Sequence, residues 1–244
     1  MARLADLVIG VSGNIGVGKS TLLDAAESDL FSHILTDILP LNCNHRQVKS
    51  YGEVLDKNIL NHFYKKPTRH AFTAQIYFFS TRLIREEMAA DTPGIVLLER
   101  PIEEDRYIFG EAQLRLNRMG IEFPIYDSLY QILSKKIPPP DIYIHLKSDV
   151  TSLIQKIKKR GRPEEKKLLK DIPYLELLHG LYEEFFTSRV TRPVLTIDST
   201  RLDLTQDLDT QYLQNIFVQL AQKVKDEKIL EQKYAAVDRL GYKS

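Results

Sequence analysis

A stretch near the N-terminus has the residue types and spacing of a phosphate-binding loop. It matches the pattern G-x-x-x-x-G-K-[ST] and consists of Gly13, Asn14, Ile15, Gly16, Val17, Gly18, Lys19, Ser20 and Thr21. Such glycines let backbone N–H groups surround phosphate oxygens, and the N-terminus of a following helix adds favourable partial charge. Lys19 would reach the β- and γ-phosphates, and the Ser20 hydroxyl would ligate Mg²⁺. The motif indicates a nucleoside triphosphate and leaves the acceptor open.

A second group of charges follows the apolar run Ile95–Leu98. Glu99 and Arg100 come directly after it, and Asp105 lies a little further along the chain. In open parallel sheets, ligands bind beyond the carboxyl ends of the strands. A carboxylate there could hold Mg²⁺ directly or through water, and an arginine could bind an anionic oxygen. A solvated strand end is the alternative, and the pair Glu99–Arg100 taken alone favours it.

Two polar residues share a face of the segment Thr68–Ala90. Gln75 and Arg82 lie about two helical turns apart. An amide and a guanidinium flanked by aromatic residues suit the edge of a planar heterocycle, and Asp105 could pair with Arg82. Taken alone, such residues are more often solvated.

A basic segment follows a short amphipathic stretch and contains Arg160, Gly161 and Arg162. Two arginines that bracket a glycine on a mobile loop could close over a transferring phosphoryl group. A solvated helix end, whose basic residues complement the helix dipole, is the alternative.

The elements that must position these residues alternate between short β-rich runs and longer helical stretches. The sequence predicts five strands, at Leu7–Ser12, Gln47–Tyr51, Ile95–Leu98, Ile142–Leu146 and Val194–Ile197. Continuous apolar strands separated by helices predict an α/β fold, a parallel sheet of about five strands covered by helices on both faces. No linker divides the chain, so we expect one domain over residues 1–244.

Two helical regions are the clearest. In Thr68–Ala90 an apolar stripe recurs at helical spacing, namely Phe72, Ile76, Phe79 and Leu83. From Leu204 to about Lys233 the spacing predicts one or two terminal helices.

The bulk composition narrows the class of protein. The chain has 244 residues, with 34 basic against 33 acidic side chains. This balance argues against a surface for duplex nucleic acid. No apolar run approaches the roughly 20 residues that cross a bilayer. The single cysteine, Cys43, excludes an intrachain disulfide, and the strand needed at Leu7 leaves no room for a cleavable signal, so we expect a cytoplasmic protein.

An ordered set of motifs resembles one family. The stretches are GNIGVGKST, Glu53, YKKPTRHAFTAQIYFFSTR, ERPIEEDRYIF, RGRPEE and YLELLH. Together they resemble the deoxyribonucleoside kinases of the deoxycytidine, deoxyguanosine and bacterial deoxyadenosine kinase type, from about Val8 to Ile197. The resemblance implies a P-loop kinase fold with a basic lid, ATP as phosphoryl donor, Mg²⁺, and a homodimer packed through helices.

The resemblance also implies catalytic roles. Glu53 would be the general base that accepts the proton of the 5′-hydroxyl group, and Arg100 would hold that base and the 5′-oxygen. Glu99, with Ser20, would position Mg²⁺. Arg160 and Arg162 would form the lid.

Further matching positions would bind the deoxynucleoside. The resemblance implies that the edge of its base is bound by Gln75, Arg82 and Asp105, and that Phe109 stacks on the face of the base. It also implies that the 3′-hydroxyl group is bound by Tyr64 and Glu165. Glu103, Glu104 and Arg106 gain no role from it, and we interpret them as solvated.

Four positions depart from the family pattern. Val54 stands where proline usually follows the base, Pro101 replaces a common serine, and His70 replaces a frequent tryptophan. Ala74 replaces the phenylalanine usual before Gln75, which leaves space in the base pocket. In this family, an aspartate and an arginine at positions 105 and 82 go with deoxycytidine or purine deoxynucleosides. Among these, the space left at Ala74 favours deoxyadenosine or deoxyguanosine as substrate, and deoxycytidine stays open.

Two other functions remain open at this point. A nucleoside monophosphate kinase shares the sheet, the phosphate loop and the basic lid. A kinase-like interaction subunit that has lost catalysis would keep the fold, although the intact loop and lid arginines argue against it.

Overall fold

Five parallel strands form the centre of the molecule. The computed structural model describes residues 4–41, 47–200 and 210–239. The strands are β1 (Ala5–Ser12), β2 (Val48–Tyr51), β3 (Gly94–Glu99), β4 (Ile142–Lys147) and β5 (Val194–Asp198), in the spatial order β2-β3-β1-β4-β5. Every pairing is parallel. The predicted α/β fold is thus confirmed, and each predicted strand is present with no end shifted by more than two residues.

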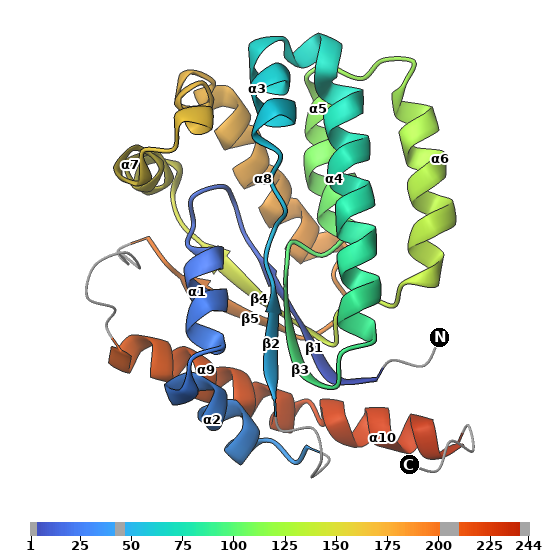
Figure 1. The fold of residues 1–244 in the computed structure, drawn as a ribbon, viewed down its shortest axis with the longest axis vertical. Coiled ribbons are helices and arrows are strands. Elements are labelled where there is room, and N and C mark those ends of the chain that lie inside the picture. Colours follow the sequence, from blue (N-terminus) through green and yellow to red (C-terminus); the bar gives the residue numbers. More distant parts are fainter. Residues whose placement is uncertain (1–3, 42–46, 201–209, 240–244) are drawn as a thin grey trace.

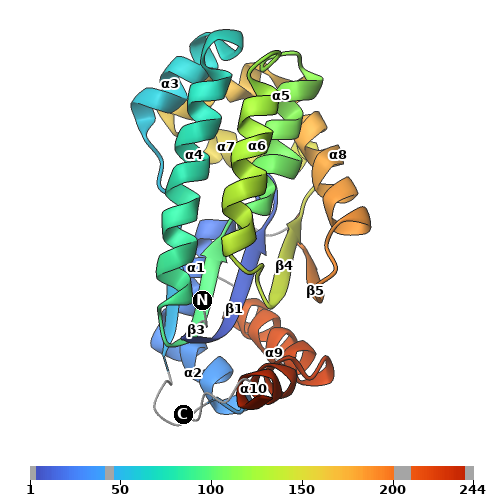
Figure 2. The same cartoon turned by 90° about the vertical axis from the view of Figure 1, so that its right-hand side faces the viewer.

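One face of the sheet is covered by helices from both ends of the chain (Figures 1 and 2). These helices are α1 (Lys19–Ala26), α2 (Asp29–Ile38), α9 (Thr210–Asp226) and α10 (Ile229–Arg239). Alternate residues of β1, such as Leu7 and Ile9, share one buried cluster with Leu22 of α1 and Phe217 of α9. Alternation along a strand sends every second side chain to this face. The predicted terminal helices correspond to α9 and α10, while Leu204 and Leu208 lie outside the described residues.

The opposite face and the carboxyl ends of the strands carry the helices that enclose the site (Figures 1 and 2). They are α3 (Lys57–Lys65), α4 (Pro67–Ala90), the π-helix η1 (Asp105–Gly110), α5 (Glu111–Arg115), α6 (Phe123–Leu133), α7 (Val150–Arg160) and α8 (Ile172–Ser188), with short 3₁₀ turns at Ser134–Lys136, Pro163–Lys166 and Leu168–Lys170. Val8 of β1 and Val96 of β3 pack against Ala89 at the end of α4. On α8, Phe186 stacks on the ring of His145 from β4 at 3.9 Å.

The long helix α4 begins one residue before the predicted Thr68, at Pro67. Proline is favoured at the first helical position because its missing N–H group has no partner there in any case. Of the predicted apolar stripe, only Phe79 is fully buried, and Phe72, Ile76 and Leu83 are half-buried. The most buried face of α4 is instead a mixed one that includes charged residues.

Pro101, one of the four departures from the family pattern, lies in close contact with β1. Gly10 lies where an added Cβ would be 2.7 Å from Cγ of Pro101 and 3.0 Å from Cγ of Pro140. Pro101 is buried. The proline therefore packs directly on the backbone of the central strand.

Within the described residues, no helix combines the length and the apolar character that a membrane span requires.

Candidate active site

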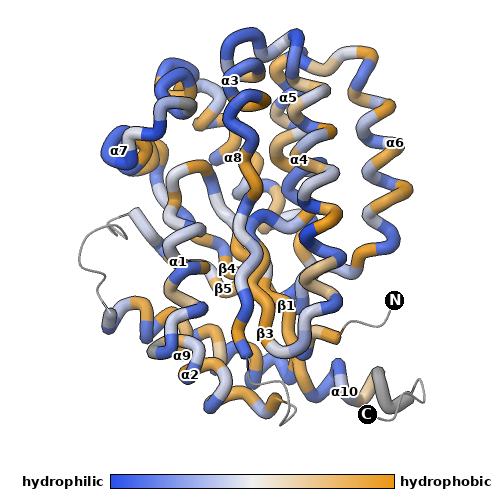
Figure 3. Tube along the Cα trace, in the orientation of Figure 1, coloured by the Kyte–Doolittle hydropathy of each residue, from blue (hydrophilic) through white to orange (hydrophobic). Residues whose placement is uncertain are grey.

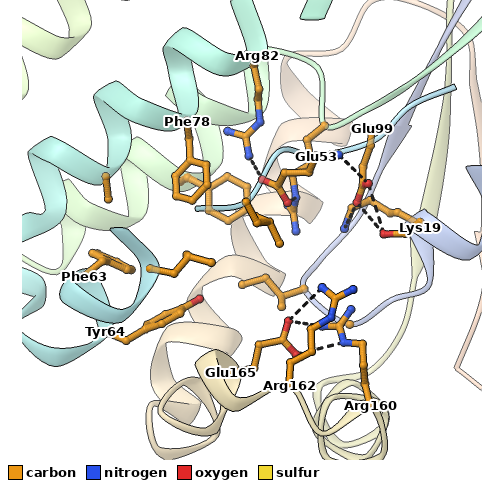
Figure 4. Close-up of a pocket in the computed structure, with 18 of the residues that line it drawn as sticks. Lys19, Glu53, Phe63, Tyr64, Phe78, Arg82, Glu99, Arg160, Arg162 and Glu165 are labelled. Carbon is orange, nitrogen blue, oxygen red and sulfur yellow. Dashed lines mark hydrogen bonds and ion pairs between the residues drawn. The ribbon is translucent and has the colours of Figure 1, made fainter. Parts of the chain in front are cut away.

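A cleft opens beyond the carboxyl ends of the strands, between the phosphate loop, α3, α4 and α8 (Figure 4). Its volume is about 890 Å³, including its open mouth. Most of the predicted site residues line it, namely Ile15, Gly16, Gly18, Lys19, Ser20, Glu53, Tyr64, Gln75, Arg82, Glu99, Arg100, Phe109, Arg160, Arg162 and Glu165. The structure thus brings together predicted residues from five of the six stretches that carry the family resemblance.

The phosphate loop joins β1 to α1. Gly13 and Gly18 have positive φ angles of 146° and 108°, which favour glycine. At Gly13 a side chain is also excluded by space, because a Cβ would lie 2.5 Å from the carbonyl oxygen of Leu146. The buried Lys19 amine donates to the carbonyls of Gly13, at 2.9 Å, and Asn14, at 3.2 Å. Burial and repulsion by Arg100 lower the pKa of Lys19 to about 8.

Oxygen donors suited to a magnesium ion face each other beside this loop. The hydroxyl of Ser20 lies 3.4 Å from a carboxylate oxygen of Glu99, and the Lys19 amine is 3.9 Å from the same carboxylate. Hydroxyl and carboxylate oxygens are ligands that Mg²⁺ accepts alongside substrate phosphates. No cluster of three or more His, Cys, Asp or Glu residues that could hold a metal ion occurs in the described ranges. The donor set therefore fits an ion that is held largely by phosphate oxygens and water.

Glu53 lies between two arginines on the opposite wall. Nε of Arg100 donates to one of its carboxylate oxygens at 3.0 Å, and Nη2 of Arg82 donates to the other (Figure 4). Burial of Glu53 opposes its ionisation. Attraction to Arg100 and Arg82 outweighs burial and lowers the pKa of Glu53 from 4.5 to about 2. The backbone N–H of Glu53 donates to Glu99 at 3.2 Å, which ties this carboxylate to the phosphate side of the cleft.

The polar residues of α4 are buried, so their solvated interpretation is wrong. Gln75 and Arg82 are only 3% and 2% exposed. Nη1 of Arg82 donates to Asp105, which is fully buried and does not line the cleft. Oε1 of Gln75 has no hydrogen-bond partner in the described structure. Because buried polar atoms are normally paired, this amide is available to a ligand in the cleft.

The two arginines predicted to form a lid lie across the cleft from α4, Arg160 at the end of α7 and Arg162 just beyond it (Figure 4). Arg160 forms two hydrogen bonds with Glu165, at 2.5 Å and 3.1 Å, and Arg162 lies 3.9 Å from the same carboxylate. Tyr64 of α3 also lines this part of the cleft, and burial raises the pKa of its hydroxyl, which keeps it protonated. The ring of Phe109 lies 4.7 Å from the guanidinium carbon of Arg100.

Comparison with known proteins shows the family to which this chain belongs. A family model described as deoxynucleoside kinase matches residues 9–225. The chain belongs to the deoxynucleoside kinase family. The resemblance inferred from the motifs is thereby confirmed, and the chain is an enzyme that phosphorylates deoxynucleosides.

Individual relatives support the same assignment. The deoxyadenosine/deoxycytidine kinase of Bacillus subtilis (strain 168) is 28% identical over 225 residues, covering 91% of this chain and 94% of the relative. A deoxyguanosine kinase of Lactobacillus johnsonii is 29% identical, covering 90% and 93%. Among solved structures, the deoxyadenosine kinase from M. mycoides with bound dATP aligns with a TM-score of 0.65 and 26% identity, covering 87% of this chain and 97% of the other.

Four residues of this kinase that the sequence did not single out are also buried around the site. Arg85 of α4 donates to the carbonyls of Gly52, at 2.7 Å, and Glu99, at 3.0 Å. Glu86 accepts the backbone N–H of Ile102 at 2.5 Å.

The other two residues contact Arg100 directly. Glu104, which directly precedes η1, and Tyr182, which lies on α8, are both within hydrogen-bonding distance of its guanidinium. Glu104 is fully buried, so its interpretation as a solvated acid is wrong. Its neighbour Arg106 is half-buried and pairs with Glu111 and Asp127. Glu104 lies directly before η1, and its partner Tyr182 is far away in the sequence, so no local pattern signals its burial.

Proposed function

We propose that this kinase transfers the γ-phosphoryl group of ATP to the 5′-hydroxyl group of a deoxyribonucleoside. The observation that carries the proposal is Glu53, an ionised carboxylate held between Arg82 and Arg100 in the same cleft as the phosphate loop. A carboxylate there can accept the proton of an acceptor hydroxyl group. An acceptor that already carried a phosphate would need cations facing it, whereas the nearby arginines are already paired with acids.

The remaining residues of the cleft have separate tasks in the proposed reaction. Arg100 orients Glu53 and the acceptor oxygen, and Arg160 and Arg162 stabilise the charge that spreads over the transferring group. Gln75 and Arg82 bind the edge of the base, Phe109 contacts its face, and Asp105 fixes Arg82 from behind. Tyr64 and Glu165 bind the 3′-hydroxyl group.

Ser20 and Glu99 would hold Mg²⁺, which neutralises phosphate charge when it is bound. The nucleotide itself would be bound by the loop from Gly13 to Thr21, whose backbone N–H groups and Lys19 contact the phosphates.

A purine deoxynucleoside is the proposed substrate, with deoxycytidine as the second choice. Ala74 is fully buried and lines the base end of the cleft, where its small side chain leaves room for a larger ring. The B. subtilis and L. johnsonii relatives are named for deoxyadenosine, deoxycytidine and deoxyguanosine.

A radiolabelled ATP assay across four deoxynucleosides and their monophosphates tests the proposal. We expect labelled monophosphate from deoxyadenosine or deoxyguanosine. Exclusive labelling of the monophosphates would favour the nucleoside monophosphate kinase instead. Thymidine turnover well above that of both purines would overturn the substrate preference. Absence of any transfer, together with no thermal shift from ATP and Mg²⁺, would favour an inactive interaction subunit.

We also propose that the protein is a homodimer. Helices α4 and α6 contact each other, and both carry apolar residues along their length (Figure 3). Their exposed large apolar side chains are Ile84, Met88, Ile125, Leu129 and Ile132. Large apolar side chains exposed on two adjacent helices are a feature of interaction sites. Sedimentation of the wild type against Ile84→Asp/Ile132→Asp tests it, because charge at this face should convert a dimer into a monomer.

Two further expectations are kept as proposals. The described elements all pack around one sheet, which supports a single domain over residues 1–244. A cytoplasmic location stays a prediction from the sequence.

A further inference from the structure

Arg100 has an unusual backbone. It directly follows β3 and has a positive φ of 53°, which few residues with a side chain adopt. Its N–H group donates to the carbonyl of Val11 on β1 at 3.0 Å. Such a conformation persists where the surroundings impose it. The backbone of Arg100 is therefore fixed by the sheet, and the orientation of its guanidinium depends on the side chains around it.

Two of these side chains line the cleft. Glu53 accepts from Nε at 3.0 Å, and the ring of Phe109 lies 4.7 Å from the guanidinium carbon. These contacts occupy one edge and one face of the planar group. They leave the Nη1 end to be held from the other direction.

Glu104 and Tyr182 hold that end. Nη1 of Arg100 donates to the Tyr182 hydroxyl at 2.7 Å and lies 3.4 Å from Oε2 of Glu104. The Tyr182 hydroxyl in turn donates to the same Oε2 at 2.5 Å. The three groups form a closed triangle, and neither Glu104 nor Tyr182 lines the cleft. Charge-assisted hydrogen bonds of this kind fix the geometry of a guanidinium strongly.

Packing alone does not account for a carboxylate at position 104. Glu104 is 0% exposed, and its Oε1 has no hydrogen-bond partner in the described part of the chain. Burying a carboxylate is costly unless a cation lies beside it, and an apolar side chain of similar size would pack there without that cost. The contact with Arg100 is therefore the direct interaction that accounts for a charge at Glu104.

Tyr182 is held in place independently of this triangle. Its ring stacks with His145 of β4 at 6.2 Å, and His145 stacks in turn on Phe186. Burial raises the pKa of the Tyr182 hydroxyl, which keeps its proton available for Glu104. Removing only the hydroxyl would leave this packing intact.

We propose that Glu104 and Tyr182 are positioning residues for phosphoryl transfer, which hold the Arg100 guanidinium so that it presents Glu53 to the acceptor hydroxyl. The inference rests on the proposed role of Glu53. Glu104 and Asp105, which are adjacent in sequence, then act in parallel, because one anchors Arg100 and the other anchors Arg82 on either side of Glu53.

The first test compares two buried tyrosines in the full chain. Tyr182→Phe removes the hydroxyl that contacts Arg100. Tyr126→Phe removes a buried hydroxyl that has no hydrogen-bond partner among the described residues and serves as the matched control. We expect Tyr182→Phe to lower kcat by about 10- to 100-fold with little change in the KM for deoxynucleoside or ATP, because misplaced catalytic groups cost rate rather than binding. Tyr126→Phe should retain wild-type kcat.

The second test asks whether the effect passes through Arg100. In an Arg100→Ala background, Tyr182→Phe and Glu104→Gln should each change kcat by less than about twofold, because residues that act through one group are not additive. If the losses in that background equal those in the wild type, the role is merely structural and the proposal is wrong. A wild-type kcat in Tyr182→Phe would overturn it as well, whether or not Glu104→Gln folds.

These outcomes are separable from failure of the proposed function. If the wild-type chain phosphorylated no deoxynucleoside, the proposed function itself would be refuted. A wild-type chain that is active while Tyr182→Phe raises KM and leaves kcat unchanged would refute only the positioning role.

Discussion

The two walls of the cleft hold their charges in different ways. On the phosphate side, glycines such as Gly13 and Gly18 shape the backbone, and Lys19 donates to carbonyls of its own loop. These groups lie within a few residues of one another in the sequence. On the acceptor side, Glu53 and its arginines come from separate segments, and buried side-chain charges hold one another.

This difference predicts different consequences of mutation. A loop built by its backbone can lose a side chain without leaving a buried charge unpaired. A network of buried ion pairs cannot lose a charged side chain in this way, because the remaining charge is then buried without its counter-charge. Substitutions on the phosphate side should therefore affect the reaction alone, whereas those on the acceptor side should also affect folding.

The largest effect is expected at the lid, on the phosphate side. Arg160→Ala should lower kcat by roughly 10³–10⁵-fold while nucleoside binding changes much less, because the arginine stabilises charge that develops on the transferring group. Steady-state kinetics measure both, with Lys158→Ala on the exposed side of the same helix as control. Equal losses in turnover and binding, or unchanged turnover, would contradict the lid role.

The next effect is expected at Glu53. Glu53→Gln keeps the size of the side chain and removes the group that accepts the proton, so kcat should fall by about 10²–10⁴-fold. Stopped assays with deoxyadenosine measure the loss, and circular dichroism checks the fold. Activity within a few fold of the wild type would mean that another group accepts the proton.

The contrast in stability is tested by one residue from each wall. Asp105→Asn removes the buried charge that faces Arg82 and should lower the free energy of unfolding by about 3–5 kcal/mol. Ser20→Ala alters an exposed residue and should change it by less than about 0.5 kcal/mol. Urea unfolding measures both. Similar losses in the free energy of unfolding for the two variants would contradict the proposed difference between the two walls.

A smaller effect is expected from pH. Because the pKa of Glu53 is lowered from 4.5 to about 2 in the folded state, its ionisation stabilises the fold above pH 4.5, and this contribution is lost as the pH falls towards 2. A pKa difference of this size corresponds to about 3 kcal/mol. Unfolding of the wild type and Glu53→Gln at pH 7 and pH 3 measures it. The stability advantage of the wild type should shrink at pH 3, and a constant advantage would contradict the lowered pKa.

The phosphate loop could be predicted from the sequence because its parts are local. The pattern from Gly13 to Thr21 follows an apolar strand and precedes a helix, and the structure has β1 and α1 there. The five strands were predictable for a similar reason, since continuous apolar runs bounded by polar residues are a local signal.

The acceptor wall was less predictable, because burial depends on distant partners. Helical spacing put Gln75 and Arg82 on one face, but it favoured the apolar stripe through Phe72 as the inner one. The polar face is buried instead because Glu53 and Asp105, from other segments, neutralise Arg82. Glu104 was missed for the same reason, since its partner Tyr182 lies on α8. The family resemblance supplied the expected roles of Gln75, Arg82 and Asp105, which the spacing alone could not, but it gave none for Glu104.

The contact between Gly10 and Pro101 has a consequence for how this chain can evolve. A methyl group at position 10 would lie 2.7 Å from the ring of Pro101, so the two positions limit each other's size. A lineage that gains a side chain at position 10 must first replace Pro101 with a smaller residue, since the reverse order passes through a clash in the central strand. Among related sequences, we expect the two positions to change together, with a small residue always kept at one of them.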